Sequence, residues 1–205
     1  MGQFDTQIMK LDDAYETINK LSLEIDKGQK KVLEDLENII NNIKTHWRGT
    51  DASNHINSLI DEYDKYSDFF NELGDMTSYI SSYFVLMQRT RARMSEVTKV
   101  GTPELTTVNS KQLAKVENTE EYYYDPALRN DYNDICDLNS YYKEFINKTD
   151  QEIVTLLDNW KAGKGRNEIK EYFNAFWIVS NRISSRIEDL KDQMGKAIAN
   201  ASKIE

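Results

Sequence analysis

Apolar residues recur along most of the chain at steps that alternate between three and four positions. Before Trp47 the stripe comprises Ile8, Leu11, Tyr15, Ile18, Ile25, Val32, Leu36, Ile39 and Ile43, with Ser22 and Gln29 in two of its slots. After a short interruption a second stripe comprises Ala52, Ile56, Leu59, Tyr63, Tyr66, Phe70, Leu73, Ile80, Phe84, Met87 and Met94. This alternation is typical of the buried seam of a helical coiled coil. The pattern therefore predicts two long amphipathic helices separated by the interruption.

The interruption, at residues 46–55, has the composition of a tight turn between helices. Gly49 is free to adopt the left-handed backbone that ends a helix, and Thr50 and Asp51 are residue types that cap the start of the next one. Trp47 lies two residues before the glycine, where two diverging helices leave a gap that an indole can fill. We therefore predict a helical hairpin with Trp47 packed at its closed tip in a structural role.

The second half of the chain has a similar organisation. Asp125 and Pro126 favour a helix start, because Asp caps the first turn and Pro is tolerated within it. Apolar stripes follow at Ile135, Leu138, Tyr142, Phe145, Ile153, Leu156 and Trp160, and then at Ile169, Phe173, Phe176, Ile183, Ile187, Leu190 and Met194. Placing Trp160 on Trp47 also aligns two asparagines and two isoleucines, and Gly163 follows as the turn glycine. We favour duplication of one hairpin, the alternative being a chance alignment of two amphipathic patterns.

A two-helix hairpin leaves part of each apolar stripe uncovered, so it needs a second hairpin as its partner. The fold class predicted is accordingly all-α, with two long antiparallel helical hairpins packed as an elongated four-helix bundle or coiled coil. We expect the first hairpin at residues 1–99, a linker at 100–125 and a second, diverged hairpin at 126–205. Gly101 marks the linker, and a short helix opened by Ser110 is one alternative within it.

Composition narrows the classes of function. Only 2 prolines and 8 glycines occur in 205 residues, which leaves little to interrupt helices. The formal net charge of −9 argues against a protein that binds nucleic acid through its phosphates. No apolar run approaches the ~20 residues of a membrane span, and the N-terminus lacks the apolar core of a signal peptide. We therefore expect no nucleic-acid partner, no integral membrane segment, and a chain that starts in the cytoplasm.

Candidate chemistry is sparse. His46 and His55 flank the first turn, but no further ligand at helical spacing accompanies them, so we predict no metal site. The stretch from Lys161 to Arg166 is only superficially like a phosphate loop, since it lacks the full spacing and a preceding strand. Cys136 is the single cysteine, with no candidate base near it in the sequence. We expect no catalytic residue, no cofactor and no enzymatic activity.

Aromatic and methionine side chains are better candidates for function. Tyr172 and Trp177 give the last helix more aromatic surface than one buried seam requires. Two interpretations are open for them: the linker folds over this face, or a partner protein docks on it. The first hairpin is the longer one, so Phe84, Met87 and Met94 near its end are further candidates for contact with a helical partner.

The motif Trp47-Arg48-Gly49 lies midway between two long amphipathic helices, in an acidic chain without a signal peptide. This organisation resembles the WXG, or early-secreted-antigen-like, family of small proteins secreted by bacterial type VII systems. The resemblance covers roughly residues 4–97, and residues 126–200 match it loosely through their own tryptophan and glycine. It implies hairpins that pair into four-helix bundles, as homodimers or heterodimers.

Export is the second implication of the resemblance. One member of each pair commonly carries a C-terminal Tyr-x-x-x-Asp/Glu signal, read by the membrane ATPase of the secretion system. No such signal follows either hairpin, because Tyr83 and Tyr172 both lack an acidic residue four positions on. A partner that supplies the signal, a diverged signal, or a role as escort of an effector would each account for this difference.

The resemblance extends to the LXG class, in which an all-helical targeting domain of about this length precedes a toxin domain. The chain is then either an interaction protein in its own right or the targeting domain of a longer toxin. We expect a non-enzymatic interaction protein of a type VII pathway, associated with virulence and secreted without a cleaved signal peptide. The alternatives are the soluble form of a membrane-active helical toxin and a cytosolic coiled-coil adaptor.

Overall fold

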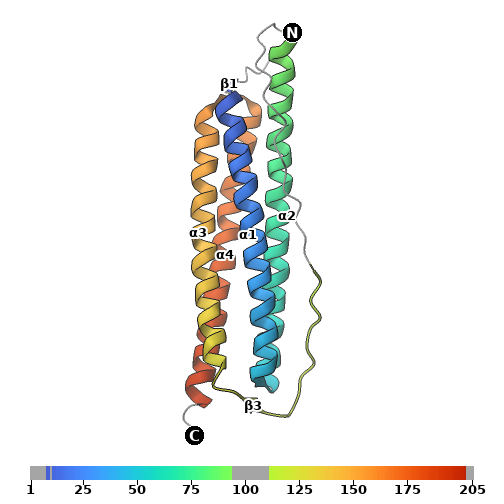
Figure 1. Cartoon of the computed structure of the whole chain (residues 1–205), viewed down its shortest axis with the longest axis vertical. Helices are drawn as coiled ribbons and strands as arrows, with labels where there is room; N and C mark the ends of the chain where they lie inside the picture. The colour runs from blue at the N-terminus through green and yellow to red at the C-terminus, as the bar shows by residue number, and fades with distance from the viewer. Residues whose placement is uncertain (1–7, 10, 94–110, 202–205) are drawn as a thin grey trace. The chain divides into compact units, whose positions relative to one another are not determined.

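The structure is a computed structural model, and it describes residues 8–9, 11–93 and 111–201 (Figure 1). Its elements, in chain order, are β1 (Ile8–Met9), α1 (Leu11–His46), β2 (Trp47–Arg48), α2 (Thr50–Arg93), β3 (Tyr123–Tyr124), α3 (Leu128–Asn159), β4 (Trp160–Ala162) and α4 (Lys164–Ala201). The helices have 36, 44, 32 and 38 residues, whereas each strand has two or three. The prediction of an all-α helical bundle is confirmed.

Helix α1 shows why the stripe produces a helix. Its apolar positions lie on one face and are fully buried at Ile18, Ile25, Val32, Leu36 and Ile43. Burying each such side chain contributes roughly 1.5–3 kcal/mol to folding. Ser22 and Gln29, the two polar slots of the stripe, are also buried, so the face is continuous. Asp12 and Asp13 in the first turn and Lys44 in the last complement the helix dipole.

The described residues fall into two compact units, and each unit contains parts of all four helices. The first unit comprises the described residues that lie within 1–27, 70–108 and 145–179. The second unit comprises those that lie within 28–69, 109–144 and 180–205. Both units therefore draw on both of the predicted hairpins, and the hairpin and linker boundaries stay a prediction.

Aromatic side chains fill the core of the first unit. Phe70 packs against Phe145 with ring centroids 5.4 Å apart, which joins α2 to α3. Tyr15 packs against Phe84 at 6.0 Å, which joins α1 to α2. Because aromatic rings bury large areas, a few such pairs hold several helices together.

The core of the second unit includes a buried charge. Tyr66 meets Tyr142 edge-on, with ring centroids 4.8 Å apart. Glu62, one helical turn before Tyr66, has 1% of its surface exposed and pairs with Lys65 at 2.6 Å and with Arg186 at 3.5 Å. These ion pairs offset part of the cost of removing the carboxylate from water. The second unit is thus joined by polar as well as apolar contacts between α2, α3 and α4.

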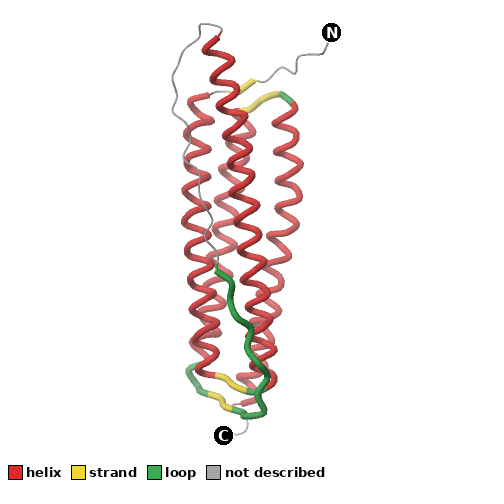
Figure 2. Tube along the Cα trace, turned by 90° about the vertical axis from the view of Figure 1, so that its right-hand side faces the viewer, coloured by secondary structure: helices red, strands yellow, loops and turns green. Residues whose placement is uncertain are grey.

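The short strands pair across the two halves of the chain (Figure 2). In the second unit β2 pairs antiparallel with β3, and Trp47 lies opposite Tyr124. In the first unit β4 pairs antiparallel with β1, and Trp160 lies opposite Met9. The order strand, helix, strand, helix occurs twice along the chain. Each turn strand therefore pairs with the leading strand of the other half. Duplication as the origin of this order stays a prediction.

The linker is extended where the structure describes it. Residues 111–122 contain no helix, so the short helix considered for the linker is absent from this part. One reason is that the Asn57 side chain on α2 bonds both the amide and the carbonyl of Val116, which then have partners without a helix. Gly101, Ser110 and Met94 lie outside the described residues.

Candidate functional sites at the helix turns

The first turn, in the second unit, reverses the chain between α1 and α2. Gly49 has a φ of +124°, a conformation that side chains rarely adopt, and α2 begins at the next residue. The Ser53 amide donates to the Gly49 carbonyl at 2.9 Å, which closes the first turn of α2. The Asp125 amide donates to the His46 carbonyl at 2.8 Å, so the segment before α3 satisfies the end of α1.

The indole of Trp47 is buried at this turn. Only 5% of the residue is exposed, and its ring lies 5.6 Å from the imidazole of His55, measured between centroids. The backbone of Trp47 is paired with that of Tyr124, which holds residue 47 next to β3. Next to it, the guanidinium of Arg48 lies 5.6 Å from the ring centroid of Tyr123, a cation–π distance. The turn is therefore closed by aromatic packing.

His55 is a titratable group buried at this turn. It is 4% exposed, and neither ring nitrogen has a hydrogen-bond partner. Burial away from water disfavours the charged imidazolium and lowers the pKa of His55 to about 4. His55 is consequently neutral at physiological pH.

His46 has a different partner. Its Nδ1 lies 2.6 Å from Oδ2 of Asp131, whose side chain is 1% exposed. Burial raises the pKa of Asp131, and the hydrogen bond with His46 opposes that rise in part. The pair joins the end of α1 to the start of α3. The two histidines that flank the turn in sequence thus act separately, His46 with a carboxylate and His55 with an indole.

The linker is bonded along α2 of the second unit. The side-chain amide of Asn57 donates to the Val116 carbonyl at 2.9 Å and accepts from the Val116 amide at 2.8 Å. The Ser53 hydroxyl donates to the Glu117 carbonyl at 3.1 Å. Lys111 contributes an exposed ion pair with Glu37 at 3.0 Å. The two bonds to Val116 reproduce a strand-like pairing, which holds the linker against the helix.

The second turn, in the first unit, uses the same residue types. Gly163 has a φ of +122°, and its carbonyl accepts from the Asn167 amide at 3.4 Å. Trp160 is fully buried, with its ring centroid 5.4 Å from that of Tyr83. A Cβ at Gly165 would lie 2.6 Å from a ring atom of Tyr83 and 2.9 Å from one of Trp160. The two rings therefore leave no room for a side chain at position 165, which explains the glycine there.

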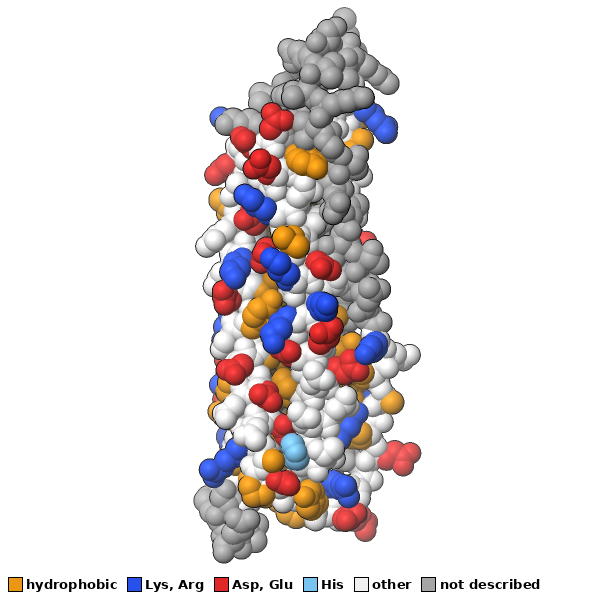
Figure 3. Space-filling model, in the orientation of Figure 1, with side chains coloured by type: hydrophobic (Ala, Val, Ile, Leu, Met, Phe, Trp, Pro, Cys, Tyr) orange, Lys and Arg blue, Asp and Glu red, His pale blue; other side chains and the backbone are white. Residues whose placement is uncertain are grey.

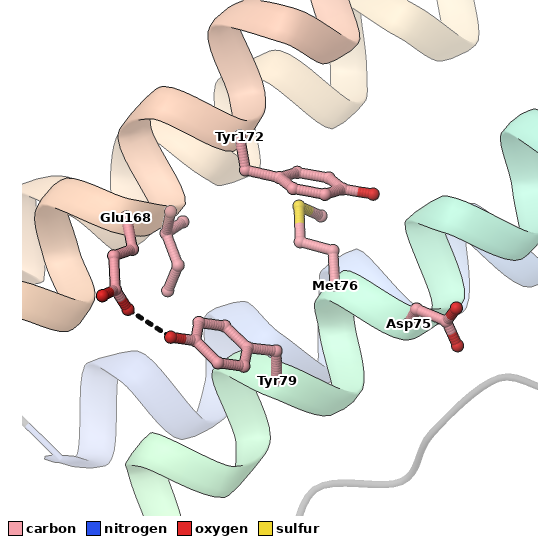
Figure 4. Close-up of a pocket in the computed structure, with 6 residues that line it drawn as sticks. Asp75, Met76, Tyr79, Glu168 and Tyr172 are labelled. Carbon is pink, nitrogen blue, oxygen red and sulfur yellow. Dashed lines mark hydrogen bonds between the residues drawn. The ribbon is translucent and has the colours of Figure 1, made fainter.

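A pocket of about 420 Å³ lies in the first unit between α2 and α4 (Figure 4). Its lining residues are Asp75, Met76, Tyr79, Glu168, Ile169 and Tyr172. Tyr79 donates a hydrogen bond to Glu168, and the Tyr172 hydroxyl donates to the Glu72 carbonyl at 3.0 Å. The pocket combines an apolar floor with two tyrosine rings and two carboxylates.

The residues predicted to bind a partner are placed differently from one another. Phe84 is fully buried and Met87 is 8% exposed, so both contribute to the core of the first unit in this structure. Tyr172 is 38% exposed and lines the pocket. Trp177 is half-buried, with its ring centroid 6.1 Å from that of Phe176. Met94 lies outside the described residues.

Sequence reasoning missed most of the pocket. Of its lining residues, Tyr172 was predicted to contact a partner and Ile169 to lie in an apolar stripe, whereas no role was predicted for Asp75, Met76, Tyr79 or Glu168. The signal was available in part, because Tyr79 and Tyr172 both lie off the apolar stripes of their helices. What the sequence lacked was the pairing of helices, which brings these two tyrosines to one pocket.

Charged side chains of both signs are interspersed on the face drawn in Figure 3.

No family model, no curated protein and no solved structure matches the chain. Among the residues that the structure describes, no helix has the length and apolar character needed to cross a membrane. The same residues contain no group of three or more His, Cys, Asp or Glu side chains that could hold a metal ion.

Proposed function

We propose that this chain is a non-enzymatic helical interaction protein of a bacterial type VII secretion pathway. In this proposal it is exported itself, or it acts as targeting partner or escort of an effector, through helix packing. The observation that carries the proposal is the Trp47-Arg48-Gly49 turn. The indole is 5% exposed, the glycine has a φ of +124°, and amphipathic helices lead in and out. This is the arrangement that the resemblance to WXG proteins implies.

Exposed apolar side chains support a partner that packs on the protein. The first unit has seven large hydrophobic side chains with substantial exposure: Leu23, Tyr79, Leu86, Val154, Tyr172, Ile178 and Val179. Leu23, Leu86 and Ile178 are more than half exposed, at 52%, 59% and 55%. Single exposed side chains are common, so what these seven residues offer a partner is contact positions on all four helices of the unit. The finer assignment to a secretion pathway rests on the turn motif.

The test is export. The full chain with a small C-terminal epitope is expressed in a bacterium with a type VII system and in a matched strain that lacks the secretion ATPase. We expect the chain in the culture supernatant of the first strain only, with a cytoplasmic enzyme as the lysis control. Equal amounts in both supernatants, or none in either together with no co-purifying effector of the system, would contradict the proposal.

Partner capture separates cargo from escort. The chain is cross-linked in the producing cells, and the recovered proteins are identified by mass spectrometry. An effector or a second WXG-like protein is the expected partner, and it should be lost in a Trp47→Ala variant that no longer forms the turn. Release of dye from lipid vesicles would instead favour the membrane-active toxin. Capture of cytoplasmic proteins alone would favour the adaptor.

A further inference from the structure

We propose that the pocket of the first unit binds a cationic side chain, the guanidinium or ammonium group of an arginine or lysine, presented by a partner protein. The cation enters between the rings of Tyr79 and Tyr172, and its alkyl stem lies on Met76 and Ile169. This assignment rests on the proposed function in one respect, namely that the partner is a protein chain. It adds the chemistry by which that partner is recognised.

The shape of the pocket suits an alkyl cation. Its volume of about 420 Å³ lies within the range of roughly 300–1,000 Å³ found for ligand pockets. Met76 and Ile169 are 3% and 1% exposed and form an apolar floor. In Figure 4 the ring of Tyr172 lies beside the thioether of Met76, and Tyr79 lies on the opposite side of the pocket. An aliphatic stem of three or four carbons would lie on such a floor with its charged end outward.

The two tyrosine rings are held in place before any ligand arrives. Tyr79 donates to Glu168, and the Tyr172 hydroxyl donates to the Glu72 carbonyl at 3.0 Å. Tethered hydroxyls leave the ring faces with little rotational freedom to lose on binding. Ring faces carry the negative part of the aromatic quadrupole and attract cations within about 6 Å of their centroids. The rings therefore form a prearranged site for positive charge.

Two of the lining residues, Asp75 and Glu168, bring negative charge to the pocket. In Figure 4 Glu168 points toward Tyr79 at one end of the pocket, whereas Asp75 lies at the other end with its carboxylate turned outward from the rings. The hydrogen bond from Tyr79 lowers the pKa of Glu168, which keeps this carboxylate ionised at neutral pH. The competing cation is Lys164, whose ammonium lies 3.4 Å from Glu168 on a side chain that is 77% exposed. Exposed pairs of this kind are weak, so an incoming guanidinium can displace the lysine.

The first experiment uses small probes on the purified full chain. Methionine methyl groups are labelled with ¹³C, and the Met76 resonance is followed during titration with 1-butylguanidinium. The matched control is N-butylurea, which has nearly the same shape and no charge. We expect a saturable shift with the cation and none with the urea. Equal shifts with both probes, or no shift with either, would overturn the proposal.

Variants assign the effect to the pocket. Glu168→Gln should weaken binding of 1-butylguanidinium about tenfold, because it removes a charged acceptor while keeping the shape of the side chain. Asp75→Asn should weaken binding about threefold; its side chain is exposed, so the variant folds like the parent. The control is Glu171→Gln, which removes an exposed charge from the same helix outside the pocket and should leave the affinity unchanged. Identical affinities for all three variants would overturn the assignment.

A peptide distinguishes a protein partner from a free amine. A helical alanine-rich peptide with one central arginine should bind more tightly than 1-butylguanidinium, whereas its citrulline counterpart should not bind. A pocket that takes the small cation but not the arginine peptide would overturn the assignment to a protein partner. Because these measurements use no secretion system, their failure is distinguishable from failure of the export test.

Discussion

The residue eight positions after the turn tryptophan differs in chemistry and surroundings between the two units. In the second unit this residue is His55, which is 4% exposed and packs against Trp47. In the first unit it is Glu168, which lines the pocket and accepts a hydrogen bond from Tyr79. The turns themselves are alike, with a buried indole followed by a glycine of positive φ. Similar backbones therefore support two different environments.

The linker contributes to this difference. In the second unit it is bonded to α2 through Ser53 and Asn57, and Tyr122 lies against Gly49, 3.5 Å from where a Cβ would be. In the first unit the corresponding glycine, Gly163, precedes a helix that faces a pocket. The two turns thus share a buried indole and a glycine of positive φ, and they differ in the surroundings of the residue eight positions after the tryptophan, which packs on the indole in the second unit and lines a pocket in the first.

The largest expected effect comes from removing either indole. Trp47→Ala and Trp160→Ala should each lower the free energy of unfolding by about 3–5 kcal/mol, because each deletes a buried aromatic side chain and leaves a cavity. Urea unfolding followed by circular dichroism measures the loss. Replacement of Trp177, which is half-buried, is the control and should cost clearly less. Equal losses for all three would remove the special role of the turn positions.

Acid should destabilise the protein through His55. Its pKa is about 4 in the folded protein and 6.5 in the unfolded chain, so the unfolded state binds more protons between these values. The contribution of the neutral His55 to the free energy of unfolding is complete above pH 6.5 and is lost as the pH falls through 4. This loss is about 3 kcal/mol, at about 1.4 kcal/mol per pKa unit.

Unfolding free energies of the parent and of His55→Leu, measured from pH 7 to pH 4, test this expectation. The difference between the two proteins should grow in favour of the variant as the pH falls. A difference that is constant over this range would contradict the neutral, buried state of His55. Trp160→Ala serves as the control, since it leaves the environment of His55 intact.

Two glycines distinguish strain of the backbone from crowding of side chains. Gly49→Ala should cost about 1–3 kcal/mol because its φ is unfavourable for a side chain, although space is available around it. Gly165→Ala should cost about 1–3 kcal/mol because its Cβ would overlap the rings of Tyr83 and Trp160.

Double variants separate the two causes. Tyr83→Ala should recover part of the loss in Gly165→Ala, because it removes one of the overlapping rings, and the coupling should exceed about 0.5 kcal/mol. Tyr122→Ala should recover nothing in Gly49→Ala. Recovery in both cases, or in neither, would show that the two glycines are required for the same reason.

The smallest expected effect concerns the linker. Asn57→Ala should cost about 1–2 kcal/mol, because it removes both hydrogen bonds to Val116, and the Val116 amide should exchange faster with deuterated water. Lys111→Ala removes only an exposed ion pair with Glu37 and should produce no measurable change. A larger effect for the lysine than for the asparagine would contradict the bonded, extended linker.

The helices were largely predictable from the apolar stripes. Ile25, Leu36 and Ile43 were placed on the seam by spacing, and all three are fully buried. Ile8 was assigned to the same stripe but lies in β1, because two residues are enough to pair with β4 and too few to show a strand pattern.

The partners of polar residues were not predictable. His46 and Asp131 are 85 positions apart, and no local pattern indicates that they meet. The contact between Tyr79 and Glu168 in the pocket was unpredictable for the same reason, because these residues are separated by 89 positions. Periodicity identifies which face of a helix is buried, but the pairing of helices decides which off-stripe residues meet.

The reciprocal pairing of the short strands has a consequence for synthesis on the ribosome. When residues 47–48 emerge, the strand that will pair with them at 123–124 does not yet exist. When residues 160–162 emerge, their partner at residues 8–9 has long been available. The strand pairing at the first turn must therefore wait for the second half of the chain, whereas the strand pairing at the second turn has its partner as soon as residues 160–162 are made.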